Sequence, residues 1–444
     1  MQISEIRLHP IAIADAPLRS SYGRHAPYAL RTIVELKTTD GITGFSETYG
    51  GDGPLAALEA AKPRVLGMDP FRLAELWQDL TAASSVSASA GSASAVAGGR
   101  TQTWLVPGEN PLDAQTRTYA AYEVACLDIL GKAVGKPVCD VIGGRVRDEV
   151  PFSAYLFYKH AGGGGLGADA RDDEYGECLD PQTIVEQCRE FIRKYGFKEI
   201  KLKGGVLDPD VEIETIRALR QEFGPAYPLR IDPNCAWSIE TSCHVGRSLR
   251  DELSNGGYLE DPCAELAGMA EVRRRLRSEG IDMAMGSNVA VTCFEHVVQA
   301  RDLDAVQVVL SDPHYWGGIR ALRRLSDLCE TLGRGVSMHS NNHLGVSLMT
   351  MAHAAAAAPQ ILYACDTHYP WQTERDEVVA GGRIKFHEGA VRIPDKPGLG
   401  VDLDYDQIER CGRIYNSLPY RKRDDEAEMR QHVDPNWKRV LPRW

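Results

Sequence analysis

The chain has 444 residues, of which 43% are hydrophobic and 25% are charged, and these ordinary globular values allow one barrel with an accessory domain. Its formal net charge of −12 argues against a nucleic-acid partner, and the lack of any apolar run of about 18 or more residues argues against a membrane span. An anionic substrate would therefore need a binding site that supplies its own positive charge.

The first residues, MQISEIRLHPIAIAD, lack a basic region followed by an apolar one, so no secretory signal is expected. The eleven cysteines are scattered without a CxxC pair, which predicts reduced thiols in a cytoplasmic protein. Each cysteine is interpreted as a small buried apolar side chain and not as a metal ligand or nucleophile.

The N-terminal third begins with a strand pattern and continues with helical patterns. Apolar residues alternate with polar ones around a turn at Asp40-Gly41, which predicts a β-hairpin over residues 33–45. Helices are expected near residues 54–66, 69–80 and 116–134. The serine- and alanine-rich stretch 84–99 is of low complexity and is expected to be a mobile loop.

From about residue 150 the pattern changes to repeated strand–helix units. Asp180-Pro181 is a typical helix start, Gly196 a typical helix end, and residues 197–202 form the next expected strand. Further strands are expected at 152–157 and near Arg230, Leu259, Met283, Val308, Met338 and Ala364. The repeat predicts an α/β fold with a TIM-like (β/α) barrel at residues 136–388. Residues 1–135 would form an α+β capping domain, and residues 389–444 would return to it.

Each expected barrel strand ends in polar residues, which are Lys201, Lys203, Asp232, Asn234, Glu260, Asn288, Asp312, His339, Asp366 and His368. From Lys203 to His368 they recur every 24 to 29 residues, which is one strand–helix repeat. The carboxyl ends of barrel strands meet at one face, where active sites are built. A single such residue could be a helix cap or a surface ion pair, but stability does not explain the whole set.

Asp232, Glu260 and Asn288 follow adjacent strands and offer three oxygen ligands. Hard oxygen donors without cysteine or a histidine pair suit Mg²⁺. Glu265 is a competing carboxylate, but it lies five residues beyond Glu260 and past the strand end. We therefore expect Glu260 to be the ligand.

Two groups of proton-transfer residues are expected on opposite sides of the barrel mouth. Lys201 and Lys203 lie two residues apart on one strand, so they share a side, and their repulsion together with a nearby metal should lower a lysine pKa. The alternative for these lysines is a solvated barrel rim. On the other side, Asp312 could orient His339 and raise its basicity.

Taken together, the segments FKEIKLKGGVL, RIDPNCAW, YLEDPC, LSDPHYW, HSNNHLGVSL, CDTHYPWQ, RIPDKPGLGVDLD and RDDEAEM resemble the enolase superfamily and, within it, the glucarate dehydratase group. The resemblance covers the chain apart from residues 84–99 and the glycine-rich stretch after His160. It implies a modified, enolase-type barrel with a capping domain. Asn288 is informative, because many relatives place a carboxylate there whereas this group places an amide.

The resemblance also implies roles for individual residues. Lys203 would be one base, and Lys201 would help to bind the substrate carboxylate. His339, paired with Asp312, would be the second base and the acid that protonates the departing hydroxyl. The remaining substrate contacts would come from Asn234, Asn288 and Asn341, and those to the distal half from His25, Tyr155, His368 and Arg423. No polar lid residue can be matched between residues 84 and 113.

The implied reaction is Mg²⁺-dependent loss of water from a hexaric acid such as D-glucarate or L-idarate, giving 5-dehydro-4-deoxy-D-glucarate. Alternatives are dehydration or epimerisation of another acid sugar such as galactarate, or a catalytically silent binding protein on the same barrel. The expected partner is a dicarboxylic acid sugar, and the chain is expected to form a homo-oligomer. An intact set of bases argues against the silent protein, because binding alone needs no base.

Overall fold

The N-terminal part of the chain is a three-stranded antiparallel sheet covered by helices. The structure, a computed structural model, describes residues 1–88 and 111–444. The sheet has the order β1 (Ile3–Ala14), β4 (Tyr28–Thr38) and β5 (Thr43–Tyr49). Gly41 takes a φ of 82° in the turn between β4 and β5, which favours glycine, so the predicted hairpin is confirmed.

Three helices follow this sheet, and α3 packs directly on β5. They are α1 (Asp52–Val65), α2 (Leu73–Ala88) and α3 (Pro111–Val134). The first five residues of the stretch expected to be a loop, 84–88, instead belong to α2. The remainder of that stretch, 89–99, lies outside the described residues.

Seven parallel strands form the second sheet, in the order of the sequence. They are β7 (Ala154–Phe157), β8 (Ile200–Lys203), β9 (Leu229–Asp232), β10 (Tyr258–Glu260), β11 (Met285–Ser287), β12 (Val308–Ser311) and β13 (Gly335–Met338). The strand expected near Ala364 is present only as isolated bridges, from Cys365 to Phe152 and from Ile361 to Val336. Because this segment contacts both ends of the sheet, it closes the barrel without being a regular strand.

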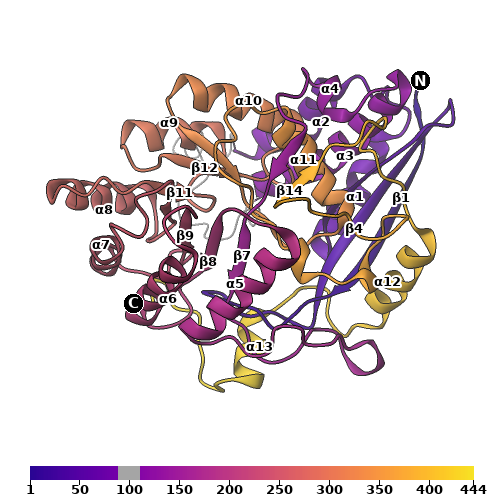
Figure 1. The fold of residues 1–444 in the computed structure, drawn as a ribbon. Helices are drawn as coiled ribbons and strands as arrows, with labels where there is room; N and C mark the ends of the chain where they lie inside the picture. Colours follow the sequence, from indigo (N-terminus) through magenta and orange to yellow (C-terminus); the bar gives the residue numbers. More distant parts are fainter. Residues whose placement is uncertain (89–110) are drawn as a thin grey trace.

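Helices surround the barrel on the outside (Figure 1). They are α5 (Pro181–Tyr195), α6 (Pro209–Phe223), α7 (Ile239–Ser248), α8 (Leu266–Ser278), α9 (Phe294–Asp302), α10 (Gly318–Thr331) and α11 (Gly345–Ala356). Helix α5 begins after Asp180 and ends at Gly196, as the sequence predicts. Asp180 accepts a hydrogen bond from Thr183 N at its start, and Gly196 takes the left-handed conformation at its end.

The C-terminal segment returns to the N-terminal sheet, and it contacts that sheet through a helix and not through its strand β14 (Ala390–Arg392). β14 pairs with β6 (Glu149–Pro151), whereas α12 (Tyr405–Ser417) packs against β1. Figure 1 shows α12 in yellow beside the indigo strand β1. The domain boundaries at 135 and 388 remain predictions. The short helices α4 (Val138–Val141) and α13 (Asp425–His432) complete the described helices.

All eleven cysteines are free thiols, and ten of them are buried; Cys293 is half-buried. They therefore pack as small apolar side chains, as predicted for ten of them. Within residues 1–88 and 111–444, no helix is both long enough and apolar enough to cross a bilayer.

Candidate active site

A cavity of about 790 Å³ opens at the carboxyl ends of the barrel strands, and residues of the capping segments also line it. Nine of the thirteen predicted site residues line this cavity: His25, Tyr155, Lys203, Asn234, Asn288, His339, Asn341, His368 and Arg423. The other four, Lys201, Asp232, Glu260 and Asp312, are buried and do not line it. The structure thus brings the predicted residues together as a wall and the layer behind it.

The charged side chains that line the described part of the cavity are all positive. Six of the described lining residues are lysine or arginine, and none is aspartate or glutamate. The carboxylates lie behind the cations: Glu47 pairs with Arg31 at 2.9 Å, and Asp15 pairs with Arg423 at 3.1 Å. A cavity that presents cations while its carboxylates are shielded suits an anionic ligand, even in a chain of net charge −12.

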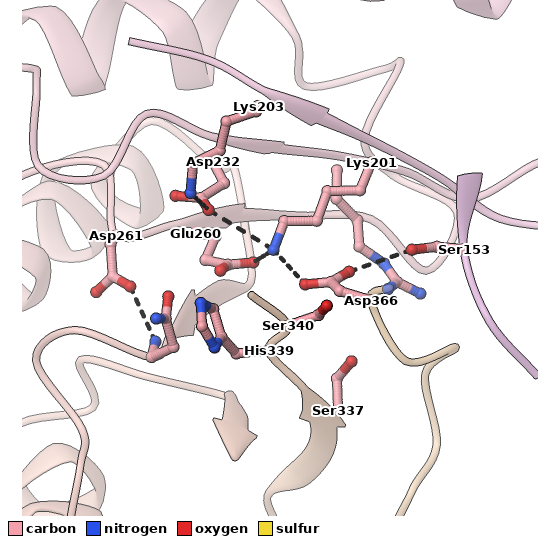
Figure 2. Close-up of polar contacts among 12 residues, drawn as sticks. Ser153, Lys201, Lys203, Asp232, Glu260, Asp261, Ser337, His339, Ser340 and Asp366 are labelled. Carbon is pink, nitrogen blue, oxygen red and sulfur yellow. Dashed lines mark hydrogen bonds and ion pairs between the residues drawn. The ribbon is translucent and has the colours of Figure 1, made fainter. Parts of the chain in front are cut away.

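Both predicted lysines contact carboxylates (Figure 2). Lys203 Nζ donates to Asp232 Oδ2 at 2.6 Å, and Lys201 Nζ lies 2.5 Å from Asp366 Oδ2 and 2.6 Å from Glu260 Oε2. Burial opposes the charged form of Lys201, but Asp366 and Glu260 more than offset this and raise its pKa well above its usual value. The sequence does not indicate how closely these carboxylates approach Lys201, and a lowered lysine pKa beside a bound metal stays a prediction.

The predicted metal ligands form a buried cluster at the ends of β9, β10 and β11. Asp232 Oδ1 accepts from Asn234 N at 3.0 Å and from its Nδ2 at 2.9 Å. Asp261, which follows Glu260, accepts from Asn288 N at 2.9 Å and so fixes that residue. Glu265 is exposed, which agrees with the preference for Glu260.

The charge and the oxygen atoms of this cluster suit a divalent cation. Burial and the neighbouring Asp232 raise the pKa of Glu260 well above its usual range, so these carboxylates together need compensating positive charge. The Asn288 side-chain amide has two orientations. In one, its nitrogen donates to Glu260 Oε1 at 3.1 Å; in the other, its oxygen faces the carboxylates and can serve with them as a metal ligand. No group of three His, Cys, Asp or Glu side chains in the described residues is arranged around a metal, but the predicted set contains only two carboxylates. A hard-oxygen set with one amide fits Mg²⁺.

Across the cavity floor, His339 is held by Asp312. His339 Nδ1 lies 3.1 Å from Asp312 Oδ2, as predicted, while Asp312 Oδ1 lies 2.6 Å from Nδ1 of a second histidine, His314. Although burial opposes ionisation, His314 and His339 keep the pKa of Asp312 well below its usual range. Figure 2 shows His339 and Lys203 on either side of Glu260.

The residues predicted for the distal half of the substrate form a second group. Asp15 accepts from Arg423 Nη1 and lies beside His25 Nδ1, both at 3.1 Å. His368 packs edge-on against Tyr155, with ring centroids 5.1 Å apart, and burial lowers its pKa well below its usual value. Asn341 belongs to this wall through a 2.7 Å hydrogen bond to Tyr49.

Three residues of this arrangement were not predicted as site residues. Asp366 follows an expected strand, but nothing in the sequence indicates its hydrogen bond with Lys201. His314 lies in the quoted segment LSDPHYW, where Asp-Pro-His also resembles an ordinary turn. Asp15 has no sequence signal, because its partners Arg423 and Asn342 are distant in the chain.

Comparisons with known proteins identify the family of the chain. The family model for the enolase C-terminal domain-like fold matches residues 183–408. A protein named "Probable glucarate dehydratase" from Streptomyces coelicolor is 43% identical, and the alignment covers 100% of this chain and 99% of that protein. The chain belongs to the enolase superfamily.

More distant and structural relatives are similar over most of the chain. A D-xylonate dehydratase from Haloferax volcanii is 25% identical over 85% of this chain and 84% of its own length. The crystal structure of an enolase from Pseudomonas fluorescens, with bound magnesium, potassium and tartrate, superposes with a TM-score of 0.90. It is 42% identical and covers 100% of this chain and 99% of that chain. An enolase-superfamily relative therefore binds both magnesium and a small dicarboxylic acid.

Proposed function

We propose that this protein is an acid-sugar dehydratase that removes the proton next to a carboxylate and then eliminates the β-hydroxyl as water. The observation that carries this proposal is that Lys203 and His339 line one cavity from the ends of two strands, β8 and β13, which β9 to β12 separate in the sheet. A binding protein needs neither base. Two of the relatives are named as dehydratases of sugar acids, which supports the same reaction class.

We infer further that the substrate is a hexaric acid, with D-glucarate as the first candidate and L-idarate as its C5 epimer. The reacting carboxylate would lie near Lys203 and Asn288, and the distal carboxylate near Arg423 and His25. An arginine fork suits a carboxylate, because it can donate two parallel hydrogen bonds. A monoacid would offer no distal carboxylate to Arg423.

The residues of the site have distinct tasks in this reaction. Lys203 removes the proton from one face of the α-carbon, and His339 Nε2 acts on the other face. His339, once protonated, gives its proton to the leaving hydroxyl. Lys201 lies beneath the floor and holds positive charge close to Glu260 and Asp366. Asp232, Glu260 and Asn288 would hold Mg²⁺, which when bound stabilises the negative charge that develops on the substrate carboxylate.

The experiment that tests this proposal is a panel of acid sugars incubated with the purified protein and Mg²⁺, with release of 2-keto acid as the measurement. Glucarate and idarate should react, whereas gluconate should react poorly because it lacks the distal carboxylate. Turnover of galactarate in preference to both would replace the substrate but keep the reaction. Racemisation or epimerisation without keto acid would contradict dehydration, and no reaction with any acid would favour the silent protein.

A further inference from the structure

Asp312 is shared by two histidines, and each uses a different oxygen. His314 Nδ1 and His314 N both contact Asp312 Oδ1, at 2.6 and 2.7 Å, and His339 Nδ1 contacts Oδ2 at 3.1 Å. All three side chains are buried or nearly so. The reaction needs only the pair Asp312–His339, so the second histidine calls for its own explanation.

The bonding pattern fixes the tautomers of both rings. An ionised carboxylate only accepts hydrogen bonds, so each Nδ1 that faces Asp312 carries a hydrogen. The Nε2 of neutral His339 is then the basic nitrogen. In neutral His314, Nε2 is an acceptor, and it lies 2.8 Å from Ser347 Oγ, which can donate to it. Ser347, His314, Asp312 and His339 thus form one continuous chain of hydrogen bonds.

The outer end of this chain is anchored in the capping segment. Ser347 N, in the first turn of α11, donates to Glu47 Oε2 at 3.0 Å, and Leu344 N donates to the same carboxylate. Glu47 lies on β5 and is itself paired with Arg31. The capping sheet therefore fixes the start of α11, and Ser347 of this helix contacts His314.

We propose that His314 is a positioning residue for the proton transfers of His339. His314 binds Oδ1 of Asp312 and so fixes the orientation of this carboxylate. Oδ2 then faces Nδ1 of His339, and Nε2 of His339 stays directed toward the cavity. This inference rests on the proposed function for its kinetic consequence only. Groups that orient a metal-ligating histidine through its second nitrogen change affinity or activity by about 10–100-fold when removed, and we expect a loss of the same order for His339.

The kinetic test compares the two C5 epimers in D₂O. His314→Phe keeps a flat ring but removes both nitrogens. It should lower keto-acid formation from the epimer deprotonated by His339 by about 10–100-fold in kcat with little change in KM. Exchange of the α-proton of the other epimer, which depends on Lys203, should stay within about twofold of the wild-type rate. His314→Asn, whose amide nitrogen can replace Nδ1 as a donor to Asp312, should recover most of the loss.

Two controls separate positioning from folding. Ser347→Ala should give a smaller loss of the same selective kind, because it removes only the outer hydrogen bond. His244→Phe changes an exposed histidine on α7, with a side chain that is 53% exposed, and should leave both reactions unchanged. If His314→Phe has no effect on keto-acid formation, or if α-proton exchange of the lysine-side epimer falls as far as keto-acid formation does, the inference is wrong.

A measurement that needs no substrate separates this inference from the proposed function. With ¹⁵N-labelled histidine, NMR should show His339 as a single Nδ1–H tautomer in the wild type and as a mixture of tautomers in His314→Phe. A single tautomer in both proteins would overturn the inference. The mixture, found in a protein whose wild type converts no acid sugar, would support the positioning role and reject the dehydratase.

Discussion

Lys203 donates a 2.6 Å hydrogen bond to Oδ2 of Asp232, so the lysine proposed as a base is paired with a proposed metal ligand. The other oxygen of Asp232 is held by Asn234. A cation bound by Asp232 would therefore compete with Lys203 for one oxygen. A lysine released in this way already lines the cavity in which the substrate would lie.

Separate replacement of the two bases should separate the two faces of the reaction. Lys203→Ala should abolish α-proton exchange for one C5 epimer while His339 still removes the proton of the other. His339→Gln should retain exchange of the lysine-side epimer but release little or no keto acid. Each lost proton transfer should cost at least about 10²-fold. NMR in D₂O measures proton exchange and product formation in one sample. Dehydration of both epimers at normal rates by His339→Gln would contradict the mechanism with a base on each face of the substrate.

Magnesium binding should depend on Glu260 and not on its neighbour in the sequence. Glu260→Gln should weaken Mg²⁺ binding measured by calorimetry and abolish keto-acid release, because it removes one of the two carboxylate charges in the set. Chelation with EDTA should stop the wild-type reaction, and added Mg²⁺ should restore it. Glu265→Gln is the matched control, since that side chain is exposed beyond the strand end. Loss of binding in Glu265→Gln with normal binding in Glu260→Gln would reverse the assignment.

Arg423 should distinguish diacids from monoacids. Arg423→Ala should raise KM for glucarate far more than for gluconate, by the equivalent of about 2–5 kcal/mol if the charge pair is desolvated. Steady-state kinetics on both acids measures this difference. Arg413→Ala removes an arginine from the exposed face of α12, where it pairs with Glu409, and should change neither KM. An equal effect of Arg423→Ala on both acids would make Arg423 structural and reopen a monoacid substrate.

The sequence predicts the barrel and the part of the cavity wall that the strand ends provide, because both follow local rules. Polar residues that end successive strands must meet at one face, so Lys203, Asp232 and His339 could be placed together from their spacing alone. The pairing of Asp366 with Lys201 spans 165 residues and depends on how the irregular segment near Ala364 closes the barrel. No local pattern contains that information.

Asp15 and Arg423 form a pair that is even farther apart in the sequence, because 408 residues separate them. It forms only when the C-terminal segment has returned to the N-terminal sheet. His314 was missed for the opposite reason. It lies two residues from Asp312, and at that distance a functional pair and a turn have the same sequence pattern.

A buried histidine outside the cavity should make the stability of the fold depend on pH. His353 on α11 donates from Nε2 to Leu399 O at 3.2 Å, and its Nδ1 accepts from Cys139 N at 3.3 Å. A proton on Nδ1 would face an N–H donor, and burial lowers the pKa of His353 to about 4. Below its usual pKa near 6.5, the unfolded chain therefore binds a proton that the folded chain does not bind until about pH 4.

The free energy of unfolding should consequently fall as the pH drops from about 6.5 toward 4. At pH 5 the titration of His353 should lower the free energy of unfolding by about 2 kcal/mol relative to neutral pH. His353→Gln cannot titrate, so its stability deficit relative to the wild type should narrow by about that amount between pH 7.5 and pH 5. Urea unfolding of both proteins at the two pH values measures the change, with His244→Gln as a control at the surface of α7. A deficit that stays constant across this range would show that His353 does not set the acid sensitivity of the fold.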